Sequence, residues 1–171
     1  DVAHHWDEVS GYYDMPIDGD VWLEDPLDSS YPPSIAFKAA QIQSEKRAVL
    51  FLRRIREMVF LEKKNICRWE HLEKAAAEVG LDTAKMKADY EGKANQLFQE
   101  DLNIARNLGV RGFPTLFFAS HENQSIKLYG VKPYIVFEKN IKKLIPNAVK
   151  KSYSKTPKAL FDYYPTLTTT E

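Results

Sequence analysis

The chain has 171 residues, with 24 basic and 24 acidic side chains, 9 prolines, 7 glycines and one cysteine, Cys67. A net charge of zero gives no uniform positive field for a phosphate backbone, and no stretch approaches the roughly 18 uninterrupted apolar residues of a membrane-spanning helix. We therefore expect neither nucleic acid nor a membrane as a partner, and one cysteine excludes an internal disulfide, a tetrathiolate metal site and a Cys-x-x-Cys pair within this chain.

The N-terminal half predicts a loop followed by a helical block. Residues 1–33 are rich in Asp, Pro, Gly and Ser, which favours an ordered lead-in loop with short helical turns. From Ser34, a candidate N-cap, apolar residues recur at helical spacing through residue 108. The expected helices cover residues 34–42, 45–63, 68–79, 83–90 and 93–108, with Asp82 as a cap and Gly80 and Gly109 as stops.

The periodicity changes after Gly109. Residues 115–119 form a short apolar run typical of a buried strand, a polar turn at 121–124 leads to a second strand at 126–129, and a helix is expected over 134–144. A two-stranded hairpin is marginal by itself, and so apolar a strand needs neighbours on both sides. The sheet is therefore expected to be incomplete, with its other strands either preceding Asp1 or supplied by another chain. Since the first residue is not Met, we expect the chain to be a fragment.

A proline directly before the first strand marks the motif that carries chemistry. Proline lacks the N–H that a strand ladder needs, so it is tolerated at the start of a strand. The pattern Val110-x-Gly112-x-Pro114-Thr115 before an apolar strand resembles the cis-proline loop of the thioredoxin superfamily, and we expect a cis bond before Pro114. Residues 20–144, beginning Asp-Val-Trp-Leu-Glu-Asp-Pro, resemble the FrnE-like cytosolic branch of the DsbA family, and residues 51–66 resemble a helix of SpxH-type adaptors.

This resemblance implies an α/β, thioredoxin-like fold with an inserted helical subdomain. Residues 1–33 would be the lead-in loop, 34–108 the inserted subdomain, 109–148 the C-terminal half of the thioredoxin-like domain, and 149–171 a linker and tail. This chain lacks three elements of the family: the first strand, the Cys-x-x-Cys helix and the next strand. The strands missing from the incomplete sheet belong to this same absent segment.

The function that the resemblance implies is thiol-disulfide oxidoreductase or isomerase chemistry in the cytoplasm of a bacterium, on protein or small thiol substrates. The catalytic dithiol would lie in the absent N-terminal segment, so no catalytic residue and no cofactor is expected in this chain, which should be inactive alone. Gly112, Phe113, Pro114 and Thr115 would bind substrate, with the Phe113 main chain pairing with an extended segment.

Two alternatives stay open on the same scaffold. One is a non-catalytic adaptor similar to SpxH that binds a second protein as its target, and the other is a glutathione-dependent transferase or isomerase of the kappa type. The residues that open the first thioredoxin helix would discriminate between the enzymes, since Cys-x-x-Cys indicates disulfide exchange and a lone Ser or Cys indicates the glutathione class.

Other conspicuous residues have plainer interpretations. Cys67 is expected to be structural, and His4-His5 to be solvated rather than to bind a metal. A basic run is expected to be a solvated helix face and linker, although it could form a patch for an acidic partner. The run comprises Lys139, Lys142, Lys143, Lys150, Lys151, Lys155 and Lys158.

Overall fold

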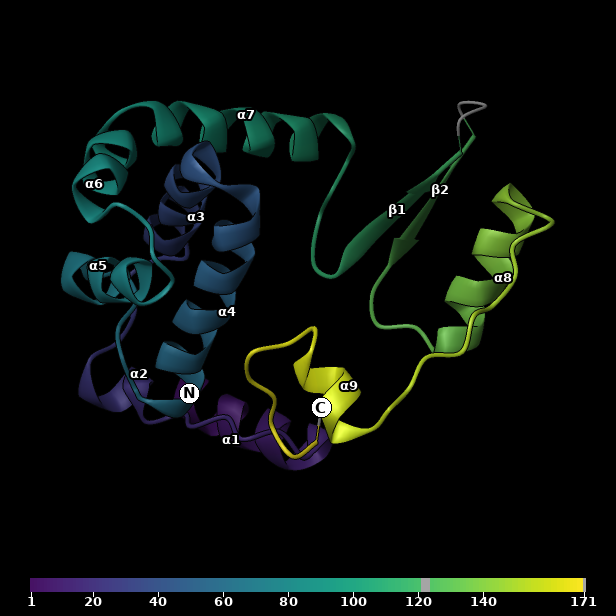
Figure 1. Ribbon diagram of the computed structural model, residues 1–171, viewed down its shortest axis with the longest axis horizontal. Coiled ribbons are helices and arrows are strands. Elements are labelled where there is room, and N and C mark those ends of the chain that lie inside the picture. The colour runs from purple at the N-terminus through teal and green to yellow at the C-terminus, as the bar shows by residue number, and fades with distance from the viewer. Residues whose placement is uncertain (121–123, 171) are drawn as a thin grey trace. The chain divides into compact units, whose positions relative to one another are not determined.

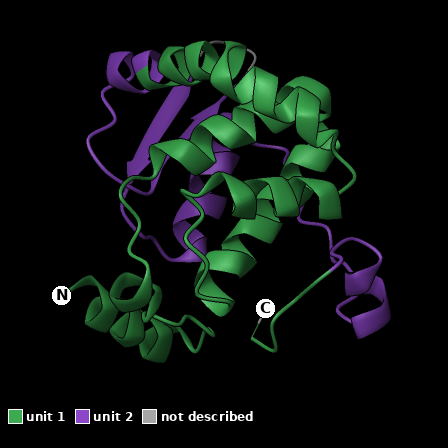
Figure 2. Cartoon of the chain, turned by 90° about the vertical axis from the view of Figure 1, so that its left-hand side faces the viewer, with its two compact units in different colours: residues 1–102, 166–171 green, residues 103–165 purple. Residues whose placement is uncertain are grey.

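The computed structural model describes residues 1–120 and 124–170. The chain forms two compact units (Figure 2): unit 1 contains residues 1–102 and the C-terminal residues from 166, and unit 2 contains residues 103–165. Most of the turn expected at 121–124 lies outside the described residues. None of the helices in the described part of the chain is long and apolar enough to cross a membrane.

Unit 1 is a helical block, as the periodicity of the sequence predicts (Figure 1). The five predicted helices are confirmed with small shifts at their ends, and Asp82 caps its helix by accepting a hydrogen bond from the Lys85 N–H. Gly80 and Gly109 both have positive φ, a conformation that ends a helix. The helices before them therefore end at the predicted glycines. The helices of the block are α3 (Tyr31–Gln43), α4 (Glu45–Leu61), α5 (Trp69–Glu78), α6 (Thr83–Glu91) and α7 (Lys93–Asn107).

The prediction of a lead-in loop over residues 1–33 is wrong in its first part. Residues Val2–Tyr13 form helix α1, whose first turn is capped by the Asp1 carboxylate. The four-residue helix α2 (Val21–Glu24) is one of the short helical turns expected in this region. The cause is tertiary packing: the Trp6 ring lies with its centre 5.5 Å from that of Trp22 and 4.9 Å from that of Phe60 in α4. Such aromatic contacts stabilise a helix that its polar local sequence does not indicate.

Helix α3 also begins earlier than expected, because Ser30 and not Ser34 is its N-cap residue. The Ser34 hydroxyl donates instead to the Ser30 carbonyl at 2.8 Å, one turn back along the helix. Pro32 and Pro33, which suggested a loop, occupy the first turn, where the missing N–H of proline costs no hydrogen bond.

The core of unit 1 lies where α3 packs against α4, α5 and α6. Helix α3 contributes three fully buried alanines, Ala36, Ala39 and Ala40, whose small side chains let its backbone approach its neighbours closely. Helix α4 fills the space with Phe51, Ile55 and Met58. The same cluster reaches Leu72 in α5 and Met86 in α6, so one continuous core joins these helices.

An ion pair attaches the segment after α2 to the start of α5. The Arg68 guanidinium donates two hydrogen bonds to the Asp25 carboxylate, one of them from Nε to Oδ2 at 2.7 Å. These bonds lower the pKa of Asp25 from 3.8 to about 2, because they stabilise the ionised carboxylate.

Acid should therefore weaken unit 1 partly through Asp25. The pKa of Asp25 is lower in the folded chain than in the unfolded chain, so its contribution is present above about pH 4 and is lost as the pH falls towards 2. We expect Asp25→Asn to flatten the fall in melting temperature between pH 4 and pH 2, as measured by circular dichroism. Asp28→Asn, which alters an exposed carboxylate in the same segment, is the matched control. If the melting temperature fell equally steeply between pH 4 and pH 2 in the wild type and in Asp25→Asn, this role of Asp25 would be contradicted.

Unit 2 contains the two predicted strands and the predicted helix. Strands β1 (Thr115–Ala119) and β2 (Ser125–Tyr129) pair antiparallel, with Thr115 opposite Tyr129 and Ala119 opposite Ser125. Helix α8 (Tyr134–Leu144) packs on β1, where the Phe118 and Phe137 ring centres lie 6.2 Å apart. Within the described residues the sheet has these two strands only, and Phe117 keeps 40% of its surface exposed. The region predicted as linker and tail also contains a short helix, α9 (Pro157–Phe161), which Thr156 caps.

Candidate functional site

The candidate site is the loop that joins α7 to β1. Gly109 leaves the helix with φ of 65°, and the Val110 N–H donates to the Ala105 carbonyl at 3.0 Å, which closes the last turn. The peptide bond between Phe113 and Pro114 is cis. At the strand entrance the Gly130 N–H donates to the Pro114 carbonyl at 2.9 Å, so the far end of the hairpin holds the end of the loop.

A close approach of the Tyr129 ring favours glycine at position 112. A Cβ atom at this position would lie 2.8 Å from Tyr129 Oη and 3.0 Å from Cε2, so any larger residue displaces that side chain. The Thr115 hydroxyl donates to the Gly112 carbonyl at 2.6 Å, which fixes the loop from the other side. The four residues predicted from the motif, Gly112 to Thr115, therefore form one tight turn. Tyr129, which the sequence analysis did not single out, supports it, since it stands opposite Thr115 in the hairpin.

Phe113 is the part of the loop that is free to bind another molecule. Its residue is 89% exposed, and within the described residues its main-chain N–H and C=O have no hydrogen-bond partner. An exposed aromatic ring beside an unpaired main-chain donor and acceptor suits an extended peptide, which can form main-chain hydrogen bonds as if it were an added strand.

Cys67 lies in unit 1, where it ties two segments together. Its thiol donates to the Ser29 carbonyl at 2.9 Å, and its N–H donates to the Asn65 side chain at 2.9 Å. The side chain is half-buried at the turn before α5. These contacts fit the structural role that the sequence analysis gave it.

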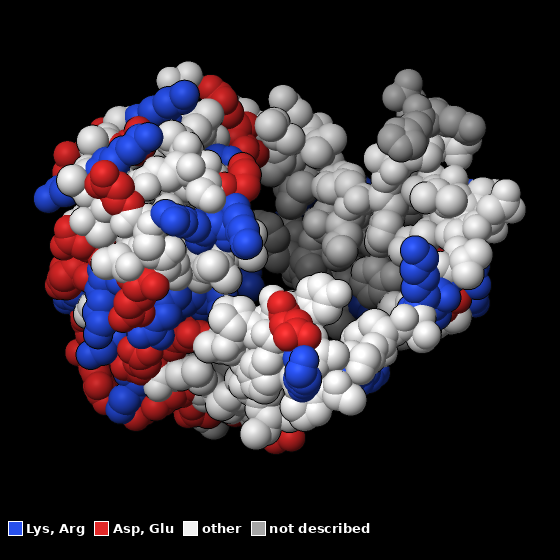
Figure 3. Space-filling view, in the orientation of Figure 1, with Lys and Arg blue, Asp and Glu red and all other residues white. Residues whose placement is uncertain are grey.

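The other singled-out residues make ordinary surface contacts. His4 and His5 both face Glu8 on the exposed side of α1, at 3.4 and 3.7 Å. In the basic run, Lys142 pairs with Glu138 at 2.8 Å, and Lys150 lies 4.7 Å from the centre of the Tyr134 ring. Figure 3 shows acidic and basic side chains interspersed over the helices of unit 1, as expected for a neutral chain.

The family follows from comparison with known proteins. Residues 3–139 match the family model described as Thioredoxin, which is more than half of the chain. The chain belongs to this family. The loop with the cis bond before Pro114 and the hairpin that follows it are therefore parts of a thioredoxin-like fold.

Several curated relatives share one name. The chain is 39% identical over 140 residues to the ClpXP adapter protein SpxH of Halalkalibacterium halodurans, a match covering 80% of this chain and 46% of the relative. It is 32% identical over 168 residues to the protein of that name from Bacillus subtilis, covering 95% of this chain and 56% of the relative. The chain thus spans about half the length of these relatives.

Solved structures share the fold at lower identity. A crystal structure from Nitrosomonas europaea, presented as a candidate protein disulfide isomerase, superposes with a TM-score of 0.72 at 16% identity and covers 84% of this chain and 71% of that one. The cytosolic disulfide reductase DsbM of Pseudomonas aeruginosa, solved with GSH, superposes with a TM-score of 0.60 at 23% identity and covers 73% of this chain and 64% of that one.

Proposed function

We propose that this chain is part of a bacterial, cytoplasmic protein-binding adaptor similar to SpxH, and that its Gly112–Thr115 loop binds an extended segment of another protein. The names of the relatives at 39% and 32% identity favour the adaptor, so we rank it ahead of the oxidoreductase that the motif suggested first. The observation that carries the binding role is Phe113, whose ring is exposed and whose main-chain N–H and C=O have no partner within residues 1–120 and 124–170.

The adaptor role can be tested in cells through ClpXP, which stands in the relatives' name and which we take as the protease that receives the adaptor's target. Deletion of the gene should lengthen the half-lives of a small set of proteins, measured by quantitative mass spectrometry after synthesis is stopped. The same set should be stabilised by deletion of ClpP, with no further effect in the double deletion. A deletion strain in which no protein depends on both genes would exclude the adaptor role.

Phe113→Ala in the full-length protein should fail to restore degradation of that set. Loss of an exposed aromatic anchor that becomes buried in a complex costs about 2 kcal/mol, which corresponds to about 30-fold weaker binding. Tyr153→Ala, which removes another exposed aromatic ring of unit 2, should restore degradation as the wild type does. Equal rescue by both variants would remove the loop from the binding site, because neither side chain contributes to a core.

The second candidate is a thiol-disulfide oxidoreductase or isomerase, which the Gly112–Thr115 motif and the fold shared with disulfide enzymes favour. It requires a dithiol outside this chain, since Cys67 is the single cysteine here. The full-length protein would then reduce insulin with dithiothreitol, and replacement of either cysteine of that dithiol would abolish turnover. Activity that depended on glutathione, with a lone Ser or Cys opening the first helix, would indicate the kappa type instead.

A further inference from the structure

The C-terminal segment of the chain, residues 166–170, returns to unit 1 after the chain has passed through unit 2. It lies beside the end of α1, the following residues 15–17, and the C-terminal half of α4. Residues 15–17, the C-terminal half of α4 and Thr168 of the segment itself line a cavity of about 220 Å³, whose apolar side chains are Met15, Pro16, Ile17, Phe60 and Leu61. Within the segment, Leu167 and Thr168 are half-buried, and Thr166, Thr169 and Thr170 are exposed.

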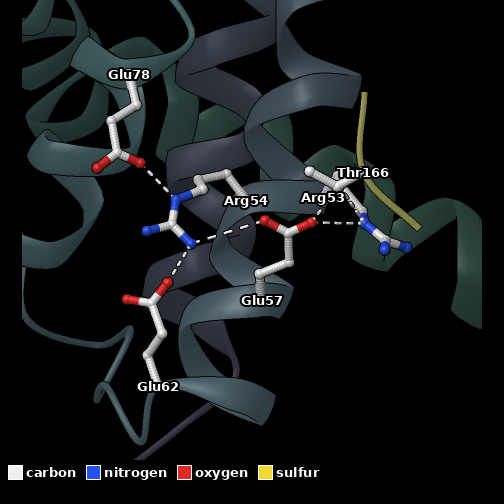
Figure 4. Close-up of polar contacts among 6 residues, drawn as sticks. All are labelled: Arg53, Arg54, Glu57, Glu62, Glu78 and Thr166. Atoms are coloured by element: carbon white, nitrogen blue, oxygen red, sulfur yellow. Dashed lines mark hydrogen bonds and ion pairs between the residues drawn. The ribbon is translucent and has the colours of Figure 1, made fainter. Parts of the chain in front are cut away.

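Thr166 makes the first anchoring contact of this segment (Figure 4). Its hydroxyl donates to the Glu57 carboxylate and accepts a hydrogen bond of 3.3 Å from Arg53 Nε. Glu57 is itself held by Arg53 at 2.9 Å and by Arg54 at 3.7 Å, and its side chain is only 16% exposed. The acceptor is therefore rigid and charged before the threonine arrives, which strengthens the hydrogen bond and lowers its entropic cost.

Two further threonines complete the contact at a spacing of two. Thr168 lines the cavity together with Met15 and Phe60, and the Thr170 hydroxyl donates to the Asp14 carbonyl at the end of α1. Asp14 is the C-cap of α1, with φ of 52°, and its N–H donates to the Ser10 carbonyl. Its own carbonyl is therefore left to accept a hydrogen bond from outside the helix. Thr169, between them, has no hydrogen-bond partner among the described residues.

We propose that this groove is a peptide-binding site of unit 1, distinct from the Gly112–Thr115 loop, and that its ligand is the chain's own segment 166–170. The site recognises the hydroxyl groups of Thr166 and Thr170, the first through the Glu57 carboxylate and the second through the Asp14 carbonyl. When residues 166–170 are bound, unit 2 (residues 103–165) is tethered to unit 1 at both of its ends, which restrains it. When they are released, the C-terminal tether is lost.

The contact can be measured by backbone 15N relaxation of the full 171-residue chain. In the wild type, the order parameters of residues 166–170 should be about 0.85, as for rigid backbone, and in a Thr166→Val, Thr170→Val double variant they should fall below about 0.6. Valine keeps the shape of threonine and removes the hydroxyl. Thr169→Val is the matched control and should leave the segment ordered.

A peptide added in trans tests the site itself. A peptide of residues 163–170 should shift the amide resonances of Ile17 and Phe60 in the double variant, whose own segment is released, and should leave the wild type unchanged because its groove is occupied. The same peptide with valine in place of Thr166 and Thr170 should not bind. A mobile segment in the wild type, equal order in all variants, or no response of the double variant to the peptide would each overturn the proposal. None of these outcomes depends on whether the protein is an adaptor or an enzyme.

Discussion

Replacement of Phe51 by alanine is expected to lower the free energy of unfolding of unit 1 by about 3 to 5 kcal/mol. Phe51 lies in α4 with none of its surface exposed and is among the largest fully buried side chains of the core. Its removal loses the transfer free energy of the ring and leaves a cavity that the neighbouring helices only partly fill. Such a loss is a large part of the total stability of a small domain.

The measurement is urea unfolding followed by tryptophan fluorescence. All three tryptophans, Trp6, Trp22 and Trp69, lie in unit 1, so the signal reports on that unit alone. Val49→Ala on the same helix is the matched control, because Val49 is 62% exposed and its truncation should change the free energy by no more than about 0.5 kcal/mol. A similar small change for Phe51→Ala would mean that α4 does not carry the core.

The second large effect is expected from Asn65→Leu, which should cost about 2 to 4 kcal/mol by the same measurement, since each buried polar group left unpaired costs about 1 to 3 kcal/mol. Asn65 is a polar residue only 2% exposed. Its amide donates to the Pro26 carbonyl at 2.9 Å and to Asp25 at 3.2 Å, and its oxygen accepts from the Cys67 N–H at 2.9 Å. Leucine has a similar volume and can make none of these bonds, so a carbonyl and an N–H lose their partners.

Cys67 offers a second readout of this change. It is the single cysteine, so Ellman's reagent reports on one site, and its thiol is bonded to the Ser29 carbonyl in the segment that Asn65 holds. Labelling should be faster in Asn65→Leu than in the wild type, because loosening the 25–30 segment exposes the thiol. Asn95→Leu, on an exposed face of α7, should change neither the unfolding free energy nor the labelling rate appreciably. Unchanged labelling in Asn65→Leu would show that Asn65 does not order this segment.

The helical block and the hairpin could be predicted because their signals are local. Apolar spacing identified helices α3 to α7, and glycine with positive φ ended the helices before Gly80 and Gly109. The change of period after residue 109 identified β1, β2 and α8 with nearly their observed ends. In each of these elements, the local conformational propensity, the spacing of apolar residues and the residues at the ends all favour the conformation that the tertiary structure has.

The candidate site was accessible to sequence analysis for a similar reason. The pattern of Gly112 and Pro114 directly before an apolar strand resembles the loop of the thioredoxin superfamily, so this short motif was enough to single out residues 112–115. The contact of Tyr129 with the loop could not be predicted from the sequence. It arises because strand pairing places Tyr129 opposite Thr115, fourteen positions earlier in the chain.

Local pattern was thus sufficient for the helical block, the hairpin, the thioredoxin-like loop and the exclusion of a dithiol within this chain. Only the tertiary structure decided that Val2–Tyr13 is a helix, that Asn65 is buried among polar partners, and that residues 166–170 return to α4. The physical reason is shared by all three. Each depends on a contact between residues far apart in the chain, where a favourable aromatic or hydrogen-bond interaction outweighs a weak or contrary local preference.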